Sequence, residues 1–337
     1  MKRFLIVCGV LLGVFLIAAL VGFYYVNSRY GLTRAPRITY SQVEGDHFPI
    51  RVEMQPLKAK DDFLNLLEQS GAKVPSYALD RVLPQEVTIL ASINPTLPQM
   101  DLHVFVNEQS FGPVIQQMLN QNLKANPPSR VVWSTQGVQF PRRGVLTLDG
   151  NVPVPSSILD AMTMEWGSAH KRVPLKMDGN HFIEAVIDNR DGAAYTLVLL
   201  LTNQEPPKAN ANQGNQGQNP AQAMQQAQLS FLTNSLKQTE SVHLIGEPGP
   251  ADVLDLTVTF TCTKESGRAG PETVKTVLDT GLTQGAPVLE SVYGLNLAGE
   301  SQIKGQTVVG TYKLSPFSKL LDMFTAPKPQ AVPAKKG

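Results

Sequence analysis

The longest apolar stretch of the chain lies at its N-terminus. Phe4–Val26 contains no charged, Asn or Gln side chain, and three aromatic residues stand at its end. As an α-helix this stretch would span about 35 Å, enough to cross the hydrocarbon core of a bilayer, and aromatic rings favour the membrane interface. The pattern predicts a transmembrane anchor within residues 1–26. Its membrane residues include Phe4, Leu12, Phe15, Phe23, Tyr24 and Tyr25.

A cleaved signal peptide is the alternative, because Lys2 and Arg3 precede the apolar stretch as in a signal sequence. The stretch is longer than a usual signal core and no small-x-small cleavage site follows it, so we interpret it as retained. The positive charge before the apolar stretch favours a cytoplasmic N-terminus, although three arginines after the stretch weaken this bias. We therefore expect the body on the extracytoplasmic side of the membrane, either periplasmic or extracellular.

Two glycines inside the anchor suggest a contact between helices. Gly9 and Gly13 are four residues apart, and such small-xxx-small spacing lets two membrane helices approach closely. A homodimer through these glycines is possible, although the spacing is common in membrane helices.

Helical and strand patterns alternate beyond the anchor. Five helices are predicted where a proline or Lys-Asp start precedes an apolar face; they begin near Asp61, Pro113, Pro155, Pro271 and Pro316. Strands are predicted from β-branched runs at Val87–Ile93, Leu102–Val106, Val131–Ser134, Val145–Leu148, Phe182–Ile187, Tyr195–Leu201, Val242–Ile245, Leu254–Thr261, Leu295–Ile303 and Thr307–Leu314. Asp178-Gly179-Asn180 and Lys304-Gly305-Gln306 predict hairpin turns. Strands joined by short turns indicate an α+β fold of mostly antiparallel sheets with covering helices.

The composition changes from residue 203 to residue 228, where half of the residues are Asn or Gln. Such a stretch buries too little apolar surface to offset the entropy of ordering it. The predicted organisation is therefore a spacer over 27–45, an α+β domain over 46–202, a linker over 203–220, a second α+β domain over 221–325 and a disordered Pro/Lys tail over 326–337.

The two sides of the linker share an order that suggests an internal duplication. Glu86 and Asp101 have the same separation as Glu240 and Asp255, and each pair is followed by a Gly-Pro helix start. Chance reuse of strand and helix signals is the alternative. If the two halves are related, one face of each equivalent strand is buried; these residues are Leu102, Val104, Val106, Leu256, Val258 and Phe260.

Charge and cysteine content narrow the possible functions. The net charge is +1, without a basic stripe interleaved with aromatics, so we expect no nucleic-acid partner. Cys8 and Cys262 are the two cysteines. With Cys8 in the anchor, no disulfide within the body is expected to hold it together.

Recognisable catalytic and cofactor motifs are missing from the sequence. It contains no phosphate-binding loop, zinc-protease helix or nucleophile elbow. Of the five histidines, His181 and His243 lie near Glu184 and Glu247, but in strand-like stretches, so we interpret each histidine as a sheet-face or surface residue. Ser-x-x-Lys matches start at Ser168 and Ser301, but neither lies in the helix that a lysine base would require.

The acidic spots have structural interpretations. Asp61-Asp62 is interpreted as a helix N-cap, and Asp188–Asp191 as a turn between strands.

These observations predict a membrane-anchored extracytoplasmic protein with a non-enzymatic binding or scaffolding role in the cell envelope. The expected partners are the bilayer and another envelope protein, and no cofactor, metal or catalytic residue is predicted. The alternative is an extracytoplasmic hydrolase or small-ligand-binding protein whose site is assembled from scattered residues.

Overall fold

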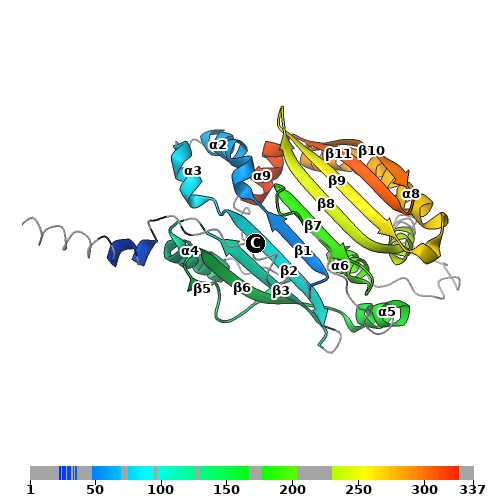
Figure 1. Ribbon diagram of the computed structural model, residues 1–337, viewed down its shortest axis with the longest axis horizontal. Coiled ribbons are helices and arrows are strands. Elements are labelled where there is room, and N and C mark those ends of the chain that lie inside the picture. Colours follow the sequence, from blue (N-terminus) through cyan, green and yellow to red (C-terminus); the bar gives the residue numbers. More distant parts are fainter. Residues whose placement is uncertain are drawn as a thin grey trace, which may run out of the picture. The chain divides into compact units, whose positions relative to one another are not determined.

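The computed structural model describes residues 23, 25–27, 29–31, 33, 35, 48–69, 75–94, 97–108, 110–125, 130–166, 177–202 and 230–325 (Figure 1). The chain divides into two compact units. Unit 1 comprises Met1–Leu57, Tyr77–Asn180 and Val186–Pro206, and unit 2 comprises Lys58–Ser76, His181–Ala185 and Pro207–Gly337. The fold is α+β, as the sequence predicted.

Unit 1 is built on antiparallel strands in the order β1, β2, β3, β6 and β4, with β5 also paired to β6. The strands are β1 (Ile50–Met54), β2 (Glu86–Asn94), β3 (Gln99–Asn107), β4 (Val132–Trp133), β5 (Gln139–Arg142) and β6 (Val145–Pro153). β7 (Ile183–Asp188) is divided between the units, and its residues 186–188 belong to unit 1. Each run predicted as a strand before residue 190 is therefore a strand, whereas β1 and β5 were not predicted.

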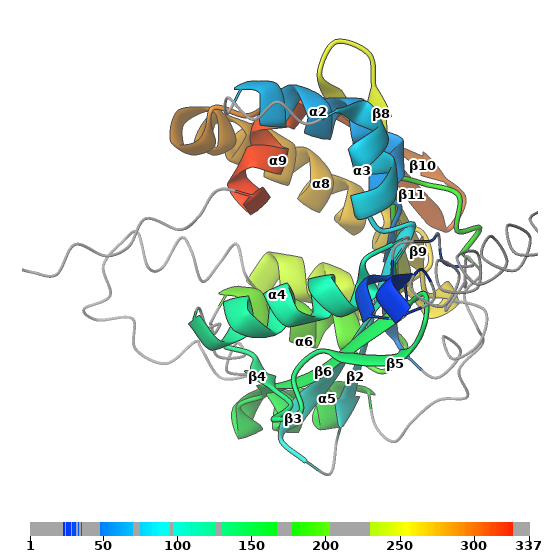
Figure 2. The same ribbon diagram turned by 90° about the vertical axis from the view of Figure 1, so that its left-hand side faces the viewer.

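Several helices of the described part of the chain accompany these strands. They are α3 (Ser76–Val82), α4 (Gly112–Ala125), α5 (Ser156–Trp166) and α6 (Ala193–Thr202). Figure 2 shows α4 and α6 on one side of the strands of unit 1. The largest fully buried apolar side chains of the unit are Leu90, Val145, Leu146, Ile158 and Leu199. They come from β2, β6, α5 and α6, so the core lies between the sheet and these helices.

The strand predicted at Tyr195–Leu201 is wrong, because these residues form α6. The run is apolar on all sides, and periodicity cannot separate a buried strand from a buried helix in such a case. The amide oxygen of Asn189 accepts hydrogen bonds from the backbone N–H groups of Ala194, at 2.8 Å, and Tyr195, at 3.4 Å. The turn over Asp188–Asp191 therefore starts a helix and does not connect two strands.

Unit 2 has antiparallel strands in the order β10, β11, β9 and β8, and residues 183–185 of β7 belong to the same unit. The strands are β8 (Thr239–Gly249), β9 (Val253–Cys262), β10 (Asn296–Lys304) and β11 (Thr307–Ser315). Its helices include α2 (Lys60–Gln69), α8 (Ala269–Val288) and α9 (Phe317–Thr325), and the described residues 230–237 are also helical. The π-helix η4 (Leu289–Tyr293) follows α8, and the short 3-10 helices are η2 (Pro56–Ala59), which begins in unit 1, and η3 (Lys264–Ser266). The helix starts predicted at Asp61, Pro113, Pro155, Pro271 and Pro316 are thus confirmed.

Turn chemistry closes the β10–β11 hairpin as predicted. Gly305 has a φ of 66°, a left-handed conformation that glycine adopts without a steric penalty. The hairpin predicted at 178–180 is not found among the described residues, where β7 has β8 and β1 as neighbours; the carboxylate of Asp178 accepts the N–H of Asn180 at 2.9 Å. Met177, just before this segment, is irregular, and residues 174–176 lie outside the described part of the chain.

Both units follow the same order of hairpin, helix, strand and helix. Unit 1 contains β2, β3, α4, β6 and α5 in this order, with β4 and β5 between α4 and β6. Unit 2 contains β8, β9, α8, β11 and α9 in this order, with η3 before α8 and with η4 and β10 between α8 and β11. Asp101 pairs with Ser92 and Asp255 pairs with Glu247, so the register differs by one residue from the match made on the sequence. The difference arises at a bulge between Thr239 and Ser241, because a bulge adds one residue to one strand only.

The prediction that one face of β3 and β9 is fully buried is wrong. Leu102, Val104, Val106, Leu256, Val258 and Phe260 are all half-buried. Alternation of side chains along a strand assigns residues to faces, but burial depends on which elements cover each face. The hydrophobic pattern therefore identified strands without showing how closely their faces are covered.

Candidate functional site

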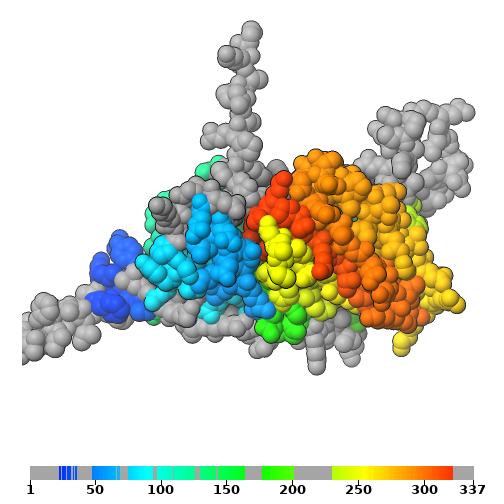
Figure 3. All heavy atoms as spheres, turned by 90° about the horizontal axis from the view of Figure 1, so that it is seen from above, coloured from blue at the N-terminus to red at the C-terminus, as the bar shows by residue number. Residues whose placement is uncertain are grey.

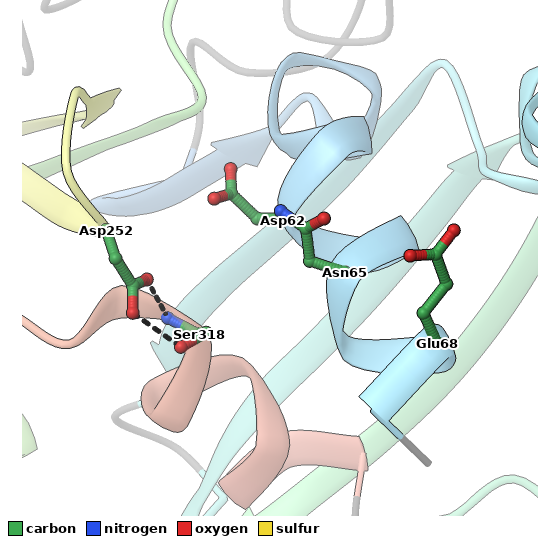
Figure 4. A pocket seen from close by; sticks show the side chains of 5 residues that line it. All are labelled: Asp62, Asn65, Glu68, Asp252 and Ser318. Carbon is green, nitrogen blue, oxygen red and sulfur yellow. Dashed lines mark hydrogen bonds between the residues drawn. The ribbon is translucent and has the colours of Figure 1, made fainter. Parts of the chain in front are cut away.

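An acidic hollow on unit 2 is the best candidate for a functional site. It encloses about 570 Å³ and is lined by Asp62, Asn65, Glu68, Asp252 and Ser318 (Figure 4). The first three residues lie on α2, Asp252 lies in the β8–β9 turn and Ser318 lies in the first turn of α9. In Figure 3, α2, this turn and α9 lie side by side on one face of the protein.

The spacing of residues on α2 places its polar side chains along the hollow. Asp62, Asn65 and Glu68 are three residues apart, and side chains with this spacing share one side of a helix. Phe63, between them, packs against the core of unit 2. Figure 4 shows the three polar side chains projecting from the same side of α2.

Asp252 is held by the start of α9. Its carboxylate accepts hydrogen bonds from the backbone N–H and the hydroxyl of Ser318, both at 2.6 Å, and its carbonyl accepts the N–H of Phe317 at 2.8 Å. The first N–H groups of a helix have no partner within the helix, and a carboxylate there is further stabilised by the helix dipole. Asp252 thus caps the N-terminus of α9, although it is distant from this helix in sequence.

The core beneath the hollow fixes α2 and α9 in place. Phe317 is buried and its ring meets that of Phe182 edge to face, with centroids 5.4 Å apart. The same cluster contains Ala59 before α2, and Leu254, Leu295, Leu314 and Leu321. The apolar faces predicted for α2 and α9 therefore meet in one core, which leaves their polar residues around the hollow.

The hollow carries uncompensated negative charge. The pKa of Asp62 is raised, first by burial, and then by the charges of Asp252 and Asp61. Among the described residues that line the hollow there are three carboxylates and no basic side chain. Like charges close together raise each other's pKa, and an incoming cation would relieve this repulsion. The arrangement is suited to binding a cationic group.

The lining offers no evident nucleophile for covalent chemistry. The hydroxyl of Ser318 donates to Asp252, and an aspartate alone is a weak base for serine activation. The described lining contains neither histidine nor cysteine. Asp61 and Asp62, interpreted from the sequence as an N-cap, lie inside the first turn of α2, where negative charge also suits the helix dipole.

Two histidine–carboxylate pairs join β8 to β7 and to the residue two positions before β7, all in unit 2. His181 contacts Glu247 at 2.7 Å between Nδ1 and Oε1, and His243 contacts Glu184 at 2.8 Å between Nε2 and Oε1. In the sequence His181 is closest to Glu184 and His243 to Glu247, whereas in the structure the partners are exchanged. Sequence spacing shows only local neighbours, so it could not identify these pairs. Glu247 also contacts Lys58 at 3.4 Å and accepts the N–H of Phe182 at 3.2 Å. His243 lies in β8, as expected for a sheet-face residue. His181 precedes β7, and its ring lies with Asp178 and Glu184 in a group whose possible ligand atoms are within 4.8 Å of one another.

The remaining candidates from the sequence have structural partners or lie outside the described residues. His103 contacts Asp149 at 2.9 Å, and the hydroxyl of Ser301 donates to Asp279 at 2.5 Å. Hydrogen bonds from Lys275 and Ser301 lower the pKa of Asp279. Ser301 therefore binds α8 and not Lys304. His47, His170 and the match from Ser168 to Lys171 fall outside the described part of the chain.

The anchor is only partly described. Phe23 and Tyr25 are helical and exposed, whereas Phe4, Leu12, Phe15, Tyr24 and the glycine pair Gly9 and Gly13 lie outside the described residues. Within the described ranges no helix is long and apolar enough to cross a membrane.

A smaller hollow on unit 1, of about 370 Å³, is lined mainly by α4 and the segment before β6. Two side-chain amides in this hollow bind the main chain of Val138. Asn120 accepts the N–H of Val138 at 2.7 Å, and Asn120 and Gln116 both donate to the carbonyl of Val138 at 3.0 Å. These amides join α4 to β5, so this hollow is explained by structure.

Cys262 should be unreactive in the folded protein. It is 1% exposed, and burial, followed by the charge of Glu240, raises its pKa to about 11. Only about one thiol in a thousand would be ionised near pH 8, and the thiolate is the reactive form. In a Cys8→Ser variant, an aromatic disulfide reagent should label Cys262 at least about 100-fold more slowly before urea unfolding than after it. Equal rates in both states would contradict its burial.

Comparison with known proteins gives no family. No family model matches the chain, and no curated protein matches it. One solved structure, described as "Structure of crystal form I of TP0453", aligns over 86% of this chain and 98% of that chain with 9% sequence identity and a TM-score of 0.35. A likeness this distant carries no argument about function.

Proposed function

We propose that the chain is a single-pass membrane-anchored protein whose two units lie outside the cytoplasm and bind another envelope protein. The apolar stretch Phe4–Val26 supports the anchor. The positive N-terminus supports the orientation. A dimer through Gly9 and Gly13 and an origin of the two units by duplication belong to the same proposal.

The acidic hollow of unit 2 is the observation that carries the binding role. Its three carboxylates surround about 570 Å³ without a basic side chain among the described lining residues. A lysine or arginine side chain of a partner fits this chemistry, because its cationic head can contact Asp62 and Glu68 and donate to Asn65. Asp252 is committed to α9, so it contributes charge while α2 supplies the more accessible acceptors.

A zero-length carbodiimide cross-linker, which joins a carboxylate to a contacting amine, tests this role in membranes that contain the full chain. We expect cross-linked peptides in which α2 is joined, through Asp62 or Glu68, to a lysine of another envelope protein. The double variant D62N/E68Q removes the two carboxylates that the reagent activates, so it must lose this cross-link. Binding itself is measured by co-purification of the same partner without the cross-linker, which should fall at least about 10-fold in D62N/E68Q, equivalent to about 1.4 kcal/mol. Peptide mass spectrometry measures the product.

The matched control is the double variant E272Q/E290Q. Both residues are exposed acids of unit 2 outside the lining of the hollow, and the change in net charge is the same. This control should retain the cross-link. Equal loss in both double variants would show a general charge effect, and a cross-link to a second copy of the chain would replace the partner protein with self-association.

A further inference from the structure

The segment that follows the predicted anchor is bound to unit 1. The described residues 23–30 are helical, and Gly31, with a φ of 63°, ends the helix by donating its N–H to the carbonyl of Asn27 at 2.7 Å. A glycine in the left-handed region is a common helix end. The side chain of Asn27 accepts the N–H of Thr33 at 2.8 Å. We call Asn27, Gly31, Thr33 and Ala35 the collar.

The collar contacts three parts of unit 1. The N–H of Phe111, before α4, donates to the carbonyl of Gly31 at 2.7 Å, and Arg143, after β5, donates to the carbonyl of Thr33 at 2.7 Å. Gln85, before β2, donates to the carbonyl of Ala35 at 3.4 Å. Ala35 itself is 5% exposed. These bonds come from separate elements, so together they restrain the position and the direction of the segment.

Gly31 also allows the backbones to approach closely. A Cβ atom at this position would lie 3.2 Å from the backbone nitrogens of both Phe111 and Gly112. This distance is shorter than most Cβ contacts, and the φ of Gly31 disfavours other residues. The collar therefore depends on a glycine at the point where it meets α4.

We infer that the collar docks one end of unit 1, formed by the start of α4 and the β5–β6 turn, against the lipid headgroups. The inference rests on the proposed anchor. From Tyr25, expected at the interface, to Gly31 a helix advances about 9 Å, so the docked end lies within about 10–15 Å of the membrane surface. Arg29 and Arg143 are exposed at this end and carry the charge that lipid phosphates attract.

The other end of the sheet points away from the collar. β3 runs from Gln99 to Asn107, about 30 Å at 3.3–3.4 Å per residue, and Asn107 donates to the carbonyl of Gly144 at 2.7 Å, beside Arg143. Leu97, in the β2–β3 turn, is 51% exposed at the far end of these strands. Figure 1 shows the described helical residues 23–30 beyond α4, opposite the far ends of β2 and β3.

Fluorescence quenching in vesicles tests this orientation. The full-length Cys8→Ser chain carries a fluorophore at Pro141→Cys or at Leu97→Cys and is reconstituted into phosphatidylcholine–phosphatidylglycerol vesicles with a nitroxide on the headgroups. Both labelled positions are exposed, and buried Cys262 does not compete for the label. We expect the label at 141 to be quenched at least about twofold more than the label at 97, because nitroxide quenching acts over distances well below the roughly 30 Å strand length.

Inserting the same flexible Gly/Ser segment at two positions tests whether the collar orients unit 1 or acts only as a spacer. An insertion between Val26 and Asn27 uncouples the anchor from the collar and should remove the difference between the two labels. The same insertion between residues 40 and 41 leaves the anchor joined to the collar, so the difference should remain.

Vesicle flotation distinguishes failure of the proposed anchor from failure of the docked end of unit 1. Failure of the unmodified chain to float with vesicles would overturn the anchor, and the docked end with it. Flotation with equal quenching at 141 and 97, or loss of the difference with both insertions, would overturn only the docked end.

Discussion

Replacing Phe317 with alanine should lower the free energy of unfolding of unit 2 by about 3–5 kcal/mol, the usual cost of truncating a buried phenylalanine. Phe317 is 1% exposed and lies in the core that joins α2 to α9, with its ring against Phe182. Because it is also the first residue of α9, its loss should loosen the capping of this helix by Asp252. Urea unfolding of the full chain in detergent, followed by far-ultraviolet circular dichroism, measures the change.

Phe231→Ala is the matched control. Phe231 also belongs to unit 2 but is 39% exposed, so the same chemical change should cost less than about 1 kcal/mol. Similar losses for the two variants would contradict the central position of Phe317. If Phe317→Ala left the unfolding transition of unit 2 unchanged, Phe317 could not belong to the core of that unit.

The helix containing Phe317 shows what the sequence could predict. Pro316 and the apolar residues three and four positions apart indicated α9, since start signals and amphipathic spacing are local properties. The run that became α6 was misassigned, because its helical start depends on the side chain of Asn189 and its apolar residues have no distinguishable period. Local chemistry therefore identified an element where one face is polar and failed where all sides are buried.

The candidate site was less accessible to sequence reasoning. Asp62 was noticed as a capping residue, but Asp252 lies far away in the chain, in a turn to which no role was given. The two residues approach through the core that joins α2 to α9, and such an approach has no local signature. The crossed pairs of His181 with Glu247 and His243 with Glu184 follow the same rule, since strand pairing selects the partners.

Glu108 should make unit 1 less stable as the pH rises. This glutamate is 2% exposed; burial raises its pKa, while the N–H of Gly144 and the charge of Arg143 act in the opposite direction. The folded pKa lies above the unfolded one, so the contribution of Glu108 is fully present below the unfolded pKa and is lost as the pH rises through the folded pKa. Relative to E108Q, which does not titrate, the wild-type chain should lose unfolding free energy as the pH rises above the unfolded pKa of a glutamate, about 4.3.

A second variant separates titration from hydrogen bonding. The Oε1 atom of Glu108 accepts the buried N–H of Gly144 at 3.0 Å, and its Oε2 atom is buried without a hydrogen-bond partner among the described residues. E108A leaves the Gly144 donor unsatisfied and should unfold about 1–3 kcal/mol more easily than E108Q, which keeps an acceptor. Neither variant titrates at this position, so their difference should be independent of pH. Urea unfolding at several pH values, followed by tryptophan fluorescence of unit 1, measures both effects, and a wild-type chain that gains stability over E108Q with rising pH would contradict the raised pKa.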